Sequence, residues 1–233
     1  EDEIEALTFE LLISVTSFFR DDEVWEAVQQ LIIEPILKSH PPEEPLRVWV
    51  AGCATGEEAY TIGILFHECA ERLDRRLPEL KIFATDINLD SIEVGRAGLY
   101  SRQIEAMVSK ERLRRYFSVD SNGYRVKKFL RDQVLFAVHN LLSDPPLSNI
   151  DFVSCRNLLI YLKSDAKKRV LDAFGYALHP NGYLLLGTSE TTSLRPSLFS
   201  TVDSTNHIYQ TEERPRPATQ SLTSCRDSAS PFG

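Results

Sequence analysis

The chain has 233 residues, with 26 Lys or Arg against 34 Asp or Glu and a formal net charge of −8 at pH 7. This length suffices to bury the core of an α/β domain, and the acidic balance argues against a general nucleic-acid binder, because neutralising phosphates requires a surplus of basic residues. Since no apolar run approaches the roughly 20 residues of a membrane span and the four cysteines form no CxxC pair, we expect a cytoplasmic protein without direct membrane insertion, disulfides or a metal site.

Two helices are predicted ahead of the first strand. Apolar residues recur at helical spacing over 4–19 and again over 24–37, and a proline-rich stretch follows. If the first helix continues, Thr16 and Arg20 are four residues apart and share one of its faces. Arg20 follows two phenylalanines, a context that equally fits a solvated helix end.

From residue 46 onward, predicted strands alternate with predicted helices. Short apolar runs predict strands at 46–51, 81–85, 134–138, 150–155 and 183–187. Helical spacing predicts one helix that ends before Pro78, one over 89–96, and one over 164–178 with Ser164 as its N-cap. This alternation predicts a mostly parallel, doubly wound sheet, with any ligand outside the carboxyl ends of the strands.

A hairpin signal interrupts this pattern, and a tail ends it. Asn122-Gly123 lies between short alternating runs and is typical of a β-hairpin turn. From Glu212 onward the sequence has no periodicity and is rich in Pro, Ser and Thr. Residues 212–233 are therefore predicted to form a disordered tail or an interdomain linker.

A turn with two glycines and two glutamates follows the first predicted strand. Glycines between a strand and a helix let the backbone approach a nucleotide-like ligand. Glu57 and Glu58 would lie at the helix N-terminus, where they would repel the pyrophosphate of a dinucleotide. The turn suits a positively charged ligand that lacks phosphate, such as S-adenosylmethionine. Two glutamates at this position would also stabilise the helix dipole without binding any ligand.

Polar residues also follow the second and fourth predicted strands. Asp86 ends the second strand, where an acid can accept hydrogen bonds from ribose hydroxyls. It could instead cap the helix that begins near Leu89. Arg156 and Asn157 follow the fourth strand at the edge where a ligand is expected, although both residue types are common in ordinary turns.

Taken together, several motifs in the same order resemble those of the CheR family of chemotaxis-receptor methyltransferases. The matching segments are residues 16–20, 56–61, 84–87, 140–142, 155–161 and 178–182. Two departures are that Ser14 stands where the family usually has Asn, and that the family's usual N-terminal helical domain is absent. The resemblance implies an α/β, Rossmann-like class I S-adenosylmethionine-dependent methyltransferase with a small antiparallel β insertion.

The resemblance also implies how the chain is divided. N-terminal helices over 1–45 would lead into an S-adenosylmethionine-binding methyltransferase domain over 46–211. A small β-subdomain would lie within it at about 114–136, and residues 212–233 would follow as the tail or linker.

Site residues are implied by the positions that match the family motifs. The cofactor S-adenosyl-L-methionine, whose product is S-adenosyl-L-homocysteine, would contact Thr16, Arg20, Glu58, Asp86, Asn140, Leu141, Arg156 and Asn157. Arg20 and Tyr161 would lie closest to the transferring methyl group and are the implied catalytic residues. No metal ligand is expected, because the five histidines are scattered along the sequence.

The implied activity is methyl transfer to glutamate side chains of a methyl-accepting chemotaxis receptor, in chemosensory adaptation. A stretch rich in Lys and Arg, residues 110–131, would suit a glutamate-rich receptor helix or would form an ordinary solvated face. Two other functions stay open. The chain could be an S-adenosylmethionine-binding regulatory or sensor module within a larger signalling fusion, or it could methylate a different carboxylate. A dinucleotide oxidoreductase is disfavoured by the glutamates at the phosphate position.

Overall fold

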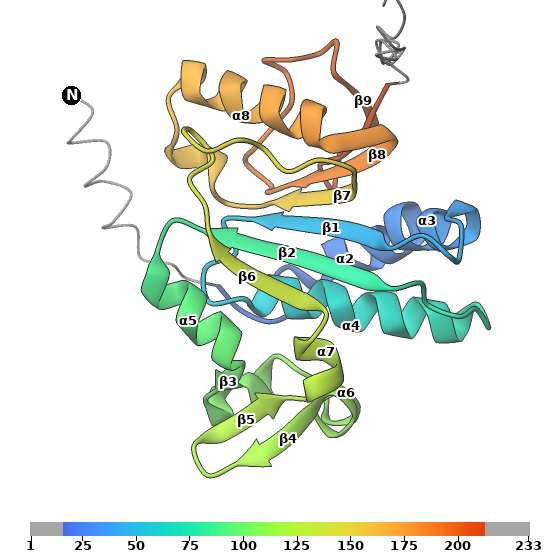
Figure 1. The fold of residues 1–233 in the computed structure, drawn as a ribbon, viewed down its shortest axis with the longest axis vertical. Helices are drawn as coiled ribbons and strands as arrows, with labels where there is room; N and C mark the ends of the chain where they lie inside the picture. The colour runs from blue at the N-terminus through green and yellow to red at the C-terminus, as the bar shows by residue number, and fades with distance from the viewer. Residues whose placement is uncertain (1–15, 213–233) are drawn as a thin grey trace, which may run out of the picture.

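A sheet of apolar strands runs through the middle of the molecule, and helices cover both of its faces (Figure 1). The computed structural model describes residues 16–212. The strands of this sheet are β1 (Leu46–Ala51), β2 (Leu80–Asp86), β6 (Val134–Val138), β7 (Ile150–Cys155), β8 (Leu178–Leu186), β9 (Phe199–Asp203) and β10 (Ile208–Thr211). Their order across the sheet is β6-β2-β1-β7-β8-β10-β9.

Most neighbouring strands in this sheet are parallel. β1 pairs with β2 on one side and with β7 on the other, and parallel pairing extends outward to β6 and β8. Among the strands of this described sheet, only β10 runs in the opposite direction, and it pairs antiparallel with β8 on one side and with the edge strand β9 on the other. The strand order therefore reverses at β1, and in sheets of this kind ligands bind outside the carboxyl ends of the strands at such a point. The predicted fold class and all the predicted strands are confirmed.

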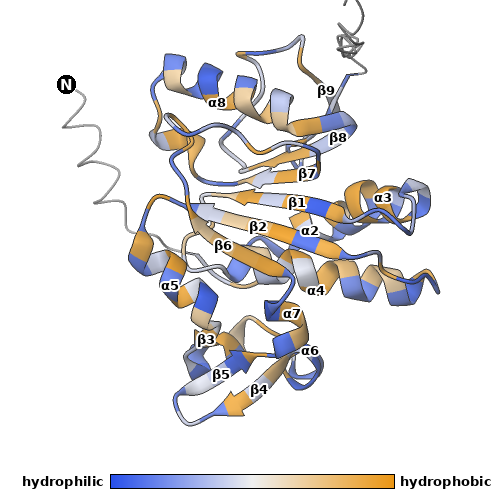
Figure 2. Ribbon diagram, viewed as in Figure 1, coloured by the Kyte–Doolittle hydropathy of each residue, from blue (hydrophilic) through white to orange (hydrophobic). Residues whose placement is uncertain are grey.

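Each face of the sheet buries its own hydrophobic core, because side chains alternate along a strand. In β1, Val48 and Val50 pack on the side of α4 (Glu57–Arg72) and α5 (Leu89–Ala97). Trp49 and Ala51 pack on the side of α8 (Ser164–Ala177). Figure 2 shows the matching pattern, with hydrophobic colour along the strands and hydrophilic colour on the outer surface of α8.

The N-terminal helices agree only in part with the sequence prediction. The helix predicted over 24–37 is present as α2 (Asp22–Val28), a π-helical turn η1 (Gln29–Ile33) and α3 (Glu34–Ser39). Of the helix predicted over 4–19, residues 4–15 lie outside the described part. Its end is wrong, because residues 16–21 form a turn with Phe19 at a φ of 52°. Phe18 and Phe19 are both buried in this turn.

A second, three-stranded sheet projects from the main one as a small subdomain (Figure 1). It contains β3 (Leu99–Tyr100), β4 (Phe117–Asp120) and β5 (Gly123–Val126), all antiparallel. The helical segments η2 (Arg102–Ala106), α6 (Lys110–Tyr116) and α7 (Lys128–Arg131) accompany it. The subdomain thus begins before residue 114, because β3 pairs with the distant β5, and it ends before β6, which belongs to the main sheet.

Two features near the carboxyl-terminal end of the described residues differ from what the sequence predicts. Ser164 is the first residue of α8 rather than its N-cap, which is Lys163 without a side-chain cap. The hairpin of β9 and β10 was not predicted, since Phe199–Asp203 is largely exposed and mostly polar.

The described helices include none whose length and apolar content would allow it to cross a bilayer.

Candidate functional site

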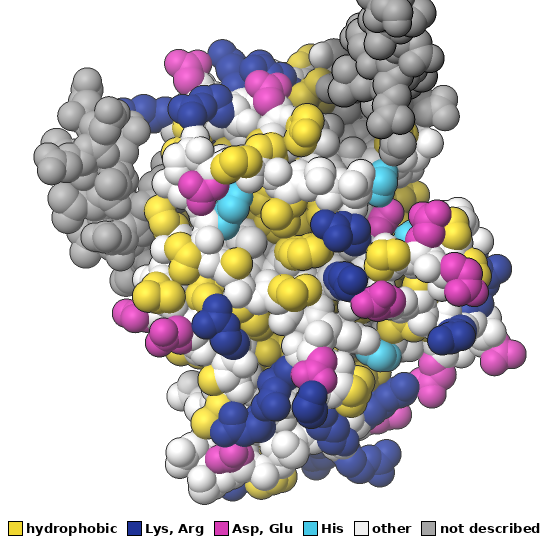
Figure 3. Space-filling model, in the orientation of Figure 1, with side chains coloured by type: hydrophobic (Ala, Val, Ile, Leu, Met, Phe, Trp, Pro, Cys, Tyr) yellow, Lys and Arg dark blue, Asp and Glu magenta, His cyan; other side chains and the backbone are white. Residues whose placement is uncertain are grey.

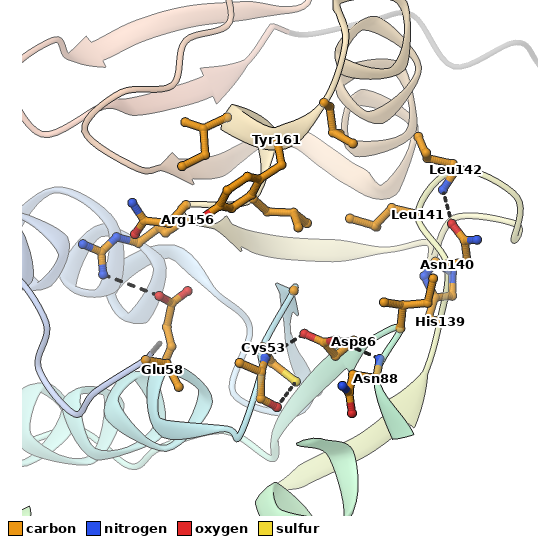
Figure 4. Close-up of a pocket in the computed structure, with 18 of the residues that line it drawn as sticks. Cys53, Glu58, Asp86, Asn88, His139, Asn140, Leu141, Leu142, Arg156 and Tyr161 are labelled. Atoms are coloured by element: carbon orange, nitrogen blue, oxygen red, sulfur yellow. Dashed lines mark hydrogen bonds and ion pairs between the residues drawn. The ribbon is translucent and has the colours of Figure 1, made fainter. Parts of the chain in front are cut away.

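One cavity opens at the carboxyl ends of the central parallel strands, where the strand order reverses (Figure 4). Its walls come from segments that are far apart in the sequence: the turn before α2, the β1–α4 turn, and the segments after β2, β6 and β7. All the residues predicted for the site line this cavity, namely Thr16, Arg20, Glu58, Asp86, Asn140, Leu141, Arg156, Asn157 and Tyr161. The structure brings them together, while their individual roles stay predictions.

The turn after β1 forms the floor of the cavity and requires a glycine at its first position. Gly52 has a φ of 73°, in the left-handed region that favours glycine. A Cβ at this position would lie 2.9 Å from Cδ2 of Leu158, which also lines the cavity. The backbone amides of Gly52 and Cys53 donate to the carbonyl oxygen of Thr85 at 2.8 and 2.9 Å, which ties the turn to β2.

The two glutamates after this turn have different surroundings. Glu58 lines the cavity, where its Oε1 accepts from the Ser154 hydroxyl at 2.7 Å and its Oε2 lies 3.5 Å from Nη1 of Arg156. Glu57 does not line the cavity and accepts a hydrogen bond from the Thr55 hydroxyl at 2.7 Å. Burial raises the pKa of Glu57 above its ordinary value. A carboxylate at the start of α4 therefore faces the cavity at Glu58, a position that disfavours a phosphate ligand.

Asp86 links the turns after β1 and β2. Its Oδ2 accepts from the backbone amide of Ala54 at 2.8 Å, and its Oδ1 accepts from that of Asn88 at 2.9 Å. The alternative role of helix cap belongs to Asn88, whose side chain accepts from the amide of Ser91. A carboxylate offers about four lone-pair positions, so Asp86 retains acceptor capacity for ligand hydroxyl groups.

Arg156 is buried beside the cavity and connects it to the N-terminal turn. Its side chain is 2% exposed, and its Nη2 lies 2.6 Å from Oδ2 of Asp21. Nη1 also donates to the backbone carbonyl of Arg20 at 3.3 Å. The guanidinium stacks over the ring of Trp25 at 5.1 Å. Arg156 therefore holds the segment that carries Arg20, in addition to lining the cavity.

The turn that carries Thr16 and Arg20 is anchored by the two phenylalanines between them. Phe18 packs edge-on against Tyr100 and Phe117 of the small subdomain, with ring centroids 4.9 and 5.4 Å apart. The Phe19 amide donates to Thr61, and the Arg112 guanidinium lies 4.0 Å from the centre of the Phe19 ring. Thr16 and Arg20 thus reach the cavity through a turn rather than through one face of a helix.

Tyr161 and Cys53 both line the cavity but differ in their exposure to solvent. Tyr161 is 53% exposed, and its side chain points toward the cavity in Figure 4. Cys53 lines the cavity but is buried, and this burial, together with the nearby Asp86, raises the pKa of its thiol well above the usual range. A thiol of this kind stays protonated at neutral pH and is a poor nucleophile.

Sequence reasoning missed some residues of the cavity wall. Asn88 and His139 both line it, and His139 is held by a hydrogen bond from Nε2 to the carbonyl oxygen of Pro145. Each follows the end of a predicted strand, so strand position was a signal that could have identified them.

The chemistry of the cavity suits a ligand with hydroxyl and amino groups and no phosphate. Asp86 and Glu58 offer carboxylate oxygens, and Gly52 leaves room for close approach to the backbone. A family model described as "CheR methyltransferase, SAM binding domain" matches residues 14–208. That match includes every residue predicted for the site.

Individual relatives agree with the family match. An uncharacterized 104.1 kDa protein of Rhodobacter capsulatus is 41% identical over 224 residues, which is 96% of this chain and 23% of that protein. The putative methyltransferase Cher3 of Pseudomonas putida is 34% identical over 78% of this chain and 66% of its own length. Chemotaxis protein methyltransferase 1 of Pseudomonas aeruginosa is 33% identical over 80% and 69%. The chain thus spans under a quarter of the Rhodobacter protein and about two thirds of Cher3.

Among solved structures, the DszA carbon methyltransferase is similar at a TM-score of 0.45 and 18% identity, over 71% of this chain and 35% of that one.

Proposed function

The chain belongs to the CheR methyltransferase family, matched over residues 14–208, and on that premise we propose that it transfers a methyl group from S-adenosylmethionine to glutamate side chains of chemotaxis receptors. The observation that carries the proposal is the convergence of Arg20, Glu58, Asp86, Arg156 and Tyr161, from separate segments, on one cavity.

S-adenosylmethionine is the cofactor of this domain, and the chemistry of the cavity fits it. The molecule has ribose hydroxyls and an amino group but no phosphate, so Asp86 would accept from the hydroxyls and Glu58 would pair with the ammonium group. Thr16, Asn140, Leu141 and Asn157 would complete the contacts. When bound, the cofactor supplies an electrophilic methyl group on a sulfonium sulfur.

The residues of this chain would then have to orient the substrate rather than activate it. A glutamate side chain is already ionised at pH 7, so its oxygen needs no general base. The requirements are placement in line with the methyl group and replacement of the water around the carboxylate. Arg20 would orient the carboxylate of the substrate, and the Tyr161 hydroxyl at the rim would donate a hydrogen bond to it.

The partner would be a methyl-accepting chemotaxis receptor, but the fold changes the expectation for the basic stretch 110–131. Lys and Arg side chains do gather over the small subdomain in Figure 3. Many of them are paired with acids, as in Arg112–Glu68, Arg115–Glu71, Arg125–Asp120 and Lys128–Asp132. Glu68, Glu71 and Asp132, which lie outside the stretch, therefore offset about half of its excess positive charge, and the stretch supports receptor docking less than its sequence suggests.

A second candidate function is a regulatory or sensor module that binds S-adenosylmethionine within a larger signalling fusion. The observation that favours it is the Rhodobacter relative, of which this chain spans 23%. A methyltransferase that acts on a different carboxylate would use the same cavity. The location we propose is the cytoplasm, a reducing compartment in which thiols such as the free Cys53, Cys69 and Cys155 stay reduced.

Transfer of labelled methyl groups tests these functions against one another. The protein is incubated with methyl-labelled S-adenosylmethionine and receptor-enriched membranes, and the label is followed into receptor-sized protein. We expect incorporation that mild base releases as methanol, because the product is a methyl ester. Binding of S-adenosylhomocysteine without transfer would favour the module, and base-stable label would point to a different acceptor.

A further inference from the structure

A buried glutamate lies behind the cavity without lining it. Glu190 follows the carboxyl end of β8 and is 3% exposed. An ionised side chain at such a position costs much free energy unless its oxygens are satisfied. The contacts of this carboxylate therefore indicate what it does.

Both oxygens of Glu190 accept hydrogen bonds from backbone amides. Oε2 accepts from Gly187 at 2.7 Å and from Asn157 at 3.1 Å. Oε1 accepts from Ile160 at 3.3 Å. Hydrogen bonds from amides to a carboxylate are stronger than those between neutral groups. One side chain thus connects the end of β8 to the segment that follows β7.

The segment held in this way is the one that carries Arg156, Asn157 and Tyr161 along the cavity wall. Asn157 has a φ of 59°, in the left-handed region that Asn adopts more readily than most residues with a Cβ, so the chain turns sharply where the Glu190 carboxylate meets it. The backbone at Gly187, just past the end of β8, also lies very close to this segment. A Cβ at Gly187 would lie 2.8 Å from both the Asn157 amide and Oε2 of Glu190.

Glu190 is itself held by the edge of the main sheet. Its amide donates to the Gly187 carbonyl at 2.9 Å, and its carbonyl accepts from Nδ1 of His207 at 2.7 Å. The Leu186 amide in turn donates to the His207 carbonyl at 3.1 Å. The backbone of Glu190 is therefore held by β8 and by the loop between β9 and β10.

We propose that Glu190 is a positioning residue for the cofactor: its carboxylate sets the backbone of residues 157–160 so that Arg156, Asn157 and Tyr161 face the cavity in binding geometry. This role rests on the proposed function only for its effect on catalysis, since cofactor binding can be measured alone. Glu190→Gln keeps the shape of the side chain but replaces one carboxylate oxygen with an NH2 group, which donates hydrogen bonds. That NH2 group would face the backbone N–H of Asn157 or of Ile160, which is also a donor.

The test is calorimetric titration of S-adenosylhomocysteine into the folded protein. The variant is Glu190→Gln, and the matched control is Asp151→Asn. Asp151 also accepts from a backbone amide, that of Arg47 at 2.8 Å, but it lies outside the cavity. Circular dichroism fixes a temperature at which all three proteins are folded. Glu190→Gln should raise the Kd about tenfold, the effect of losing one charge-assisted hydrogen bond, and Asp151→Asn should leave the Kd within about twofold.

A Glu190→Gln protein that melts at a lower temperature but binds with the wild-type Kd would overturn the proposal, because the glutamate would then be purely structural. If the variant does not fold, amide exchange in the wild-type protein decides. The Asn157 and Ile160 amides should exchange slowly and slow further with S-adenosylhomocysteine; exchange at the rate of unprotected amides would overturn the proposal. Failure of the proposed function looks different: wild-type protein would bind S-adenosylhomocysteine but methylate no receptor.

Discussion

Charged side chains that are close together in the sequence differ in whether they line the cavity. Glu57 and Glu58 are neighbours, yet only Glu58 lines the cavity, because successive side chains on a helix point about 100° apart. Arg20 lines the same cavity, while its backbone carbonyl accepts from Arg156. Because Arg20, Asp86 and Glu57 have different surroundings, replacing each of them should have a different effect.

Replacing Arg20 with alanine should lower the rate of methyl transfer about a hundredfold, the scale of loss when a substrate-orienting group is removed. The fold should survive, because Phe18 and Phe19 anchor the turn through contacts that do not involve the Arg20 side chain. The measurement is labelled methyl transfer alongside circular dichroism. Arg76→Ala, an exposed arginine away from the cavity, is the control, and wild-type rates in Arg20→Ala would refute the role.

Replacing Asp86 with asparagine should raise the Kd of S-adenosylhomocysteine about tenfold, because an amide nitrogen takes the place of one acceptor oxygen that now serves the backbone or a ligand hydroxyl. Calorimetric titration measures the change. Asp90→Asn on the exposed part of α5 should bind as the wild type does. Equal affinity in both variants would remove Asp86 from the cofactor site.

Glu57 should make folding stability depend on pH in a stated direction. Burial raises its folded pKa above the unfolded value, so its ionisation favours the unfolded state, and the free energy of unfolding falls as pH rises through that window. Glu57→Gln removes this dependence while keeping an acceptor for Thr55. The stability of the variant relative to wild type, from urea unfolding, should therefore increase between about pH 4 and pH 7. A difference that stays constant with pH would contradict the assignment.

At the scale of elements, the small subdomain supports the cofactor cavity from behind. Arg112 in α6 forms two hydrogen bonds to Glu68 in α4, at 2.9 and 2.8 Å, and also stacks on Phe19. Tyr100 in β3 donates to the backbone carbonyl of Thr55, in the turn before α4. The insertion between α5 and β6 is thus joined both to the Thr16–Arg20 turn and to the turn that precedes Glu58.

Arg112→Ala should weaken binding of S-adenosylhomocysteine roughly fivefold, because a partly buried cation–π contact contributes about 1 kcal/mol to holding the Phe19 turn. Calorimetric titration again gives the Kd. Arg114→Ala lies on the same helix with an exposed side chain and serves as the control. If Arg112→Ala binds as tightly as Arg114→Ala does, the subdomain does not support the cavity through this contact.

At the scale of the whole molecule, the cavity joins segments from residue 16 to residue 162, so a ligand bound there should stabilise the entire fold. A ligand at 100 times its Kd adds about 2.7 kcal/mol, which for a domain of this size raises Tm by roughly 5–10 °C. S-adenosylhomocysteine should produce this shift in a thermal melt. NADH at the same concentration should not, and a shift with NADH would revive the dinucleotide interpretation.

The strands of the parallel sheet and the residues at their ends could be predicted from the amino-acid pattern alone. Strands such as 46–51 and 150–155 are mostly apolar, since a parallel strand is buried on both faces. Asp86, Arg156 and Asn157 could then be placed at one edge, because the carboxyl ends of parallel strands meet there. The family motifs added Thr16, Arg20 and Tyr161, whose place at the cavity no periodicity predicted.

Features that depend on partners distant in the sequence could not be predicted before the fold was known. Glu190 meets Asn157 across 33 residues, and Arg112 meets Glu68 across 44. Through the first pairing, the carboxylate of Glu190, which belongs to no local motif, holds the cavity wall. The second pairing places an acid from α4 beside one arginine of the basic stretch 110–131. The turn at 16–21 likewise depends on where Phe18 and Phe19 are buried. Such features follow from which surfaces the fold brings together, and hydrogen bonds and charge pairs of this kind leave no periodic pattern along the chain.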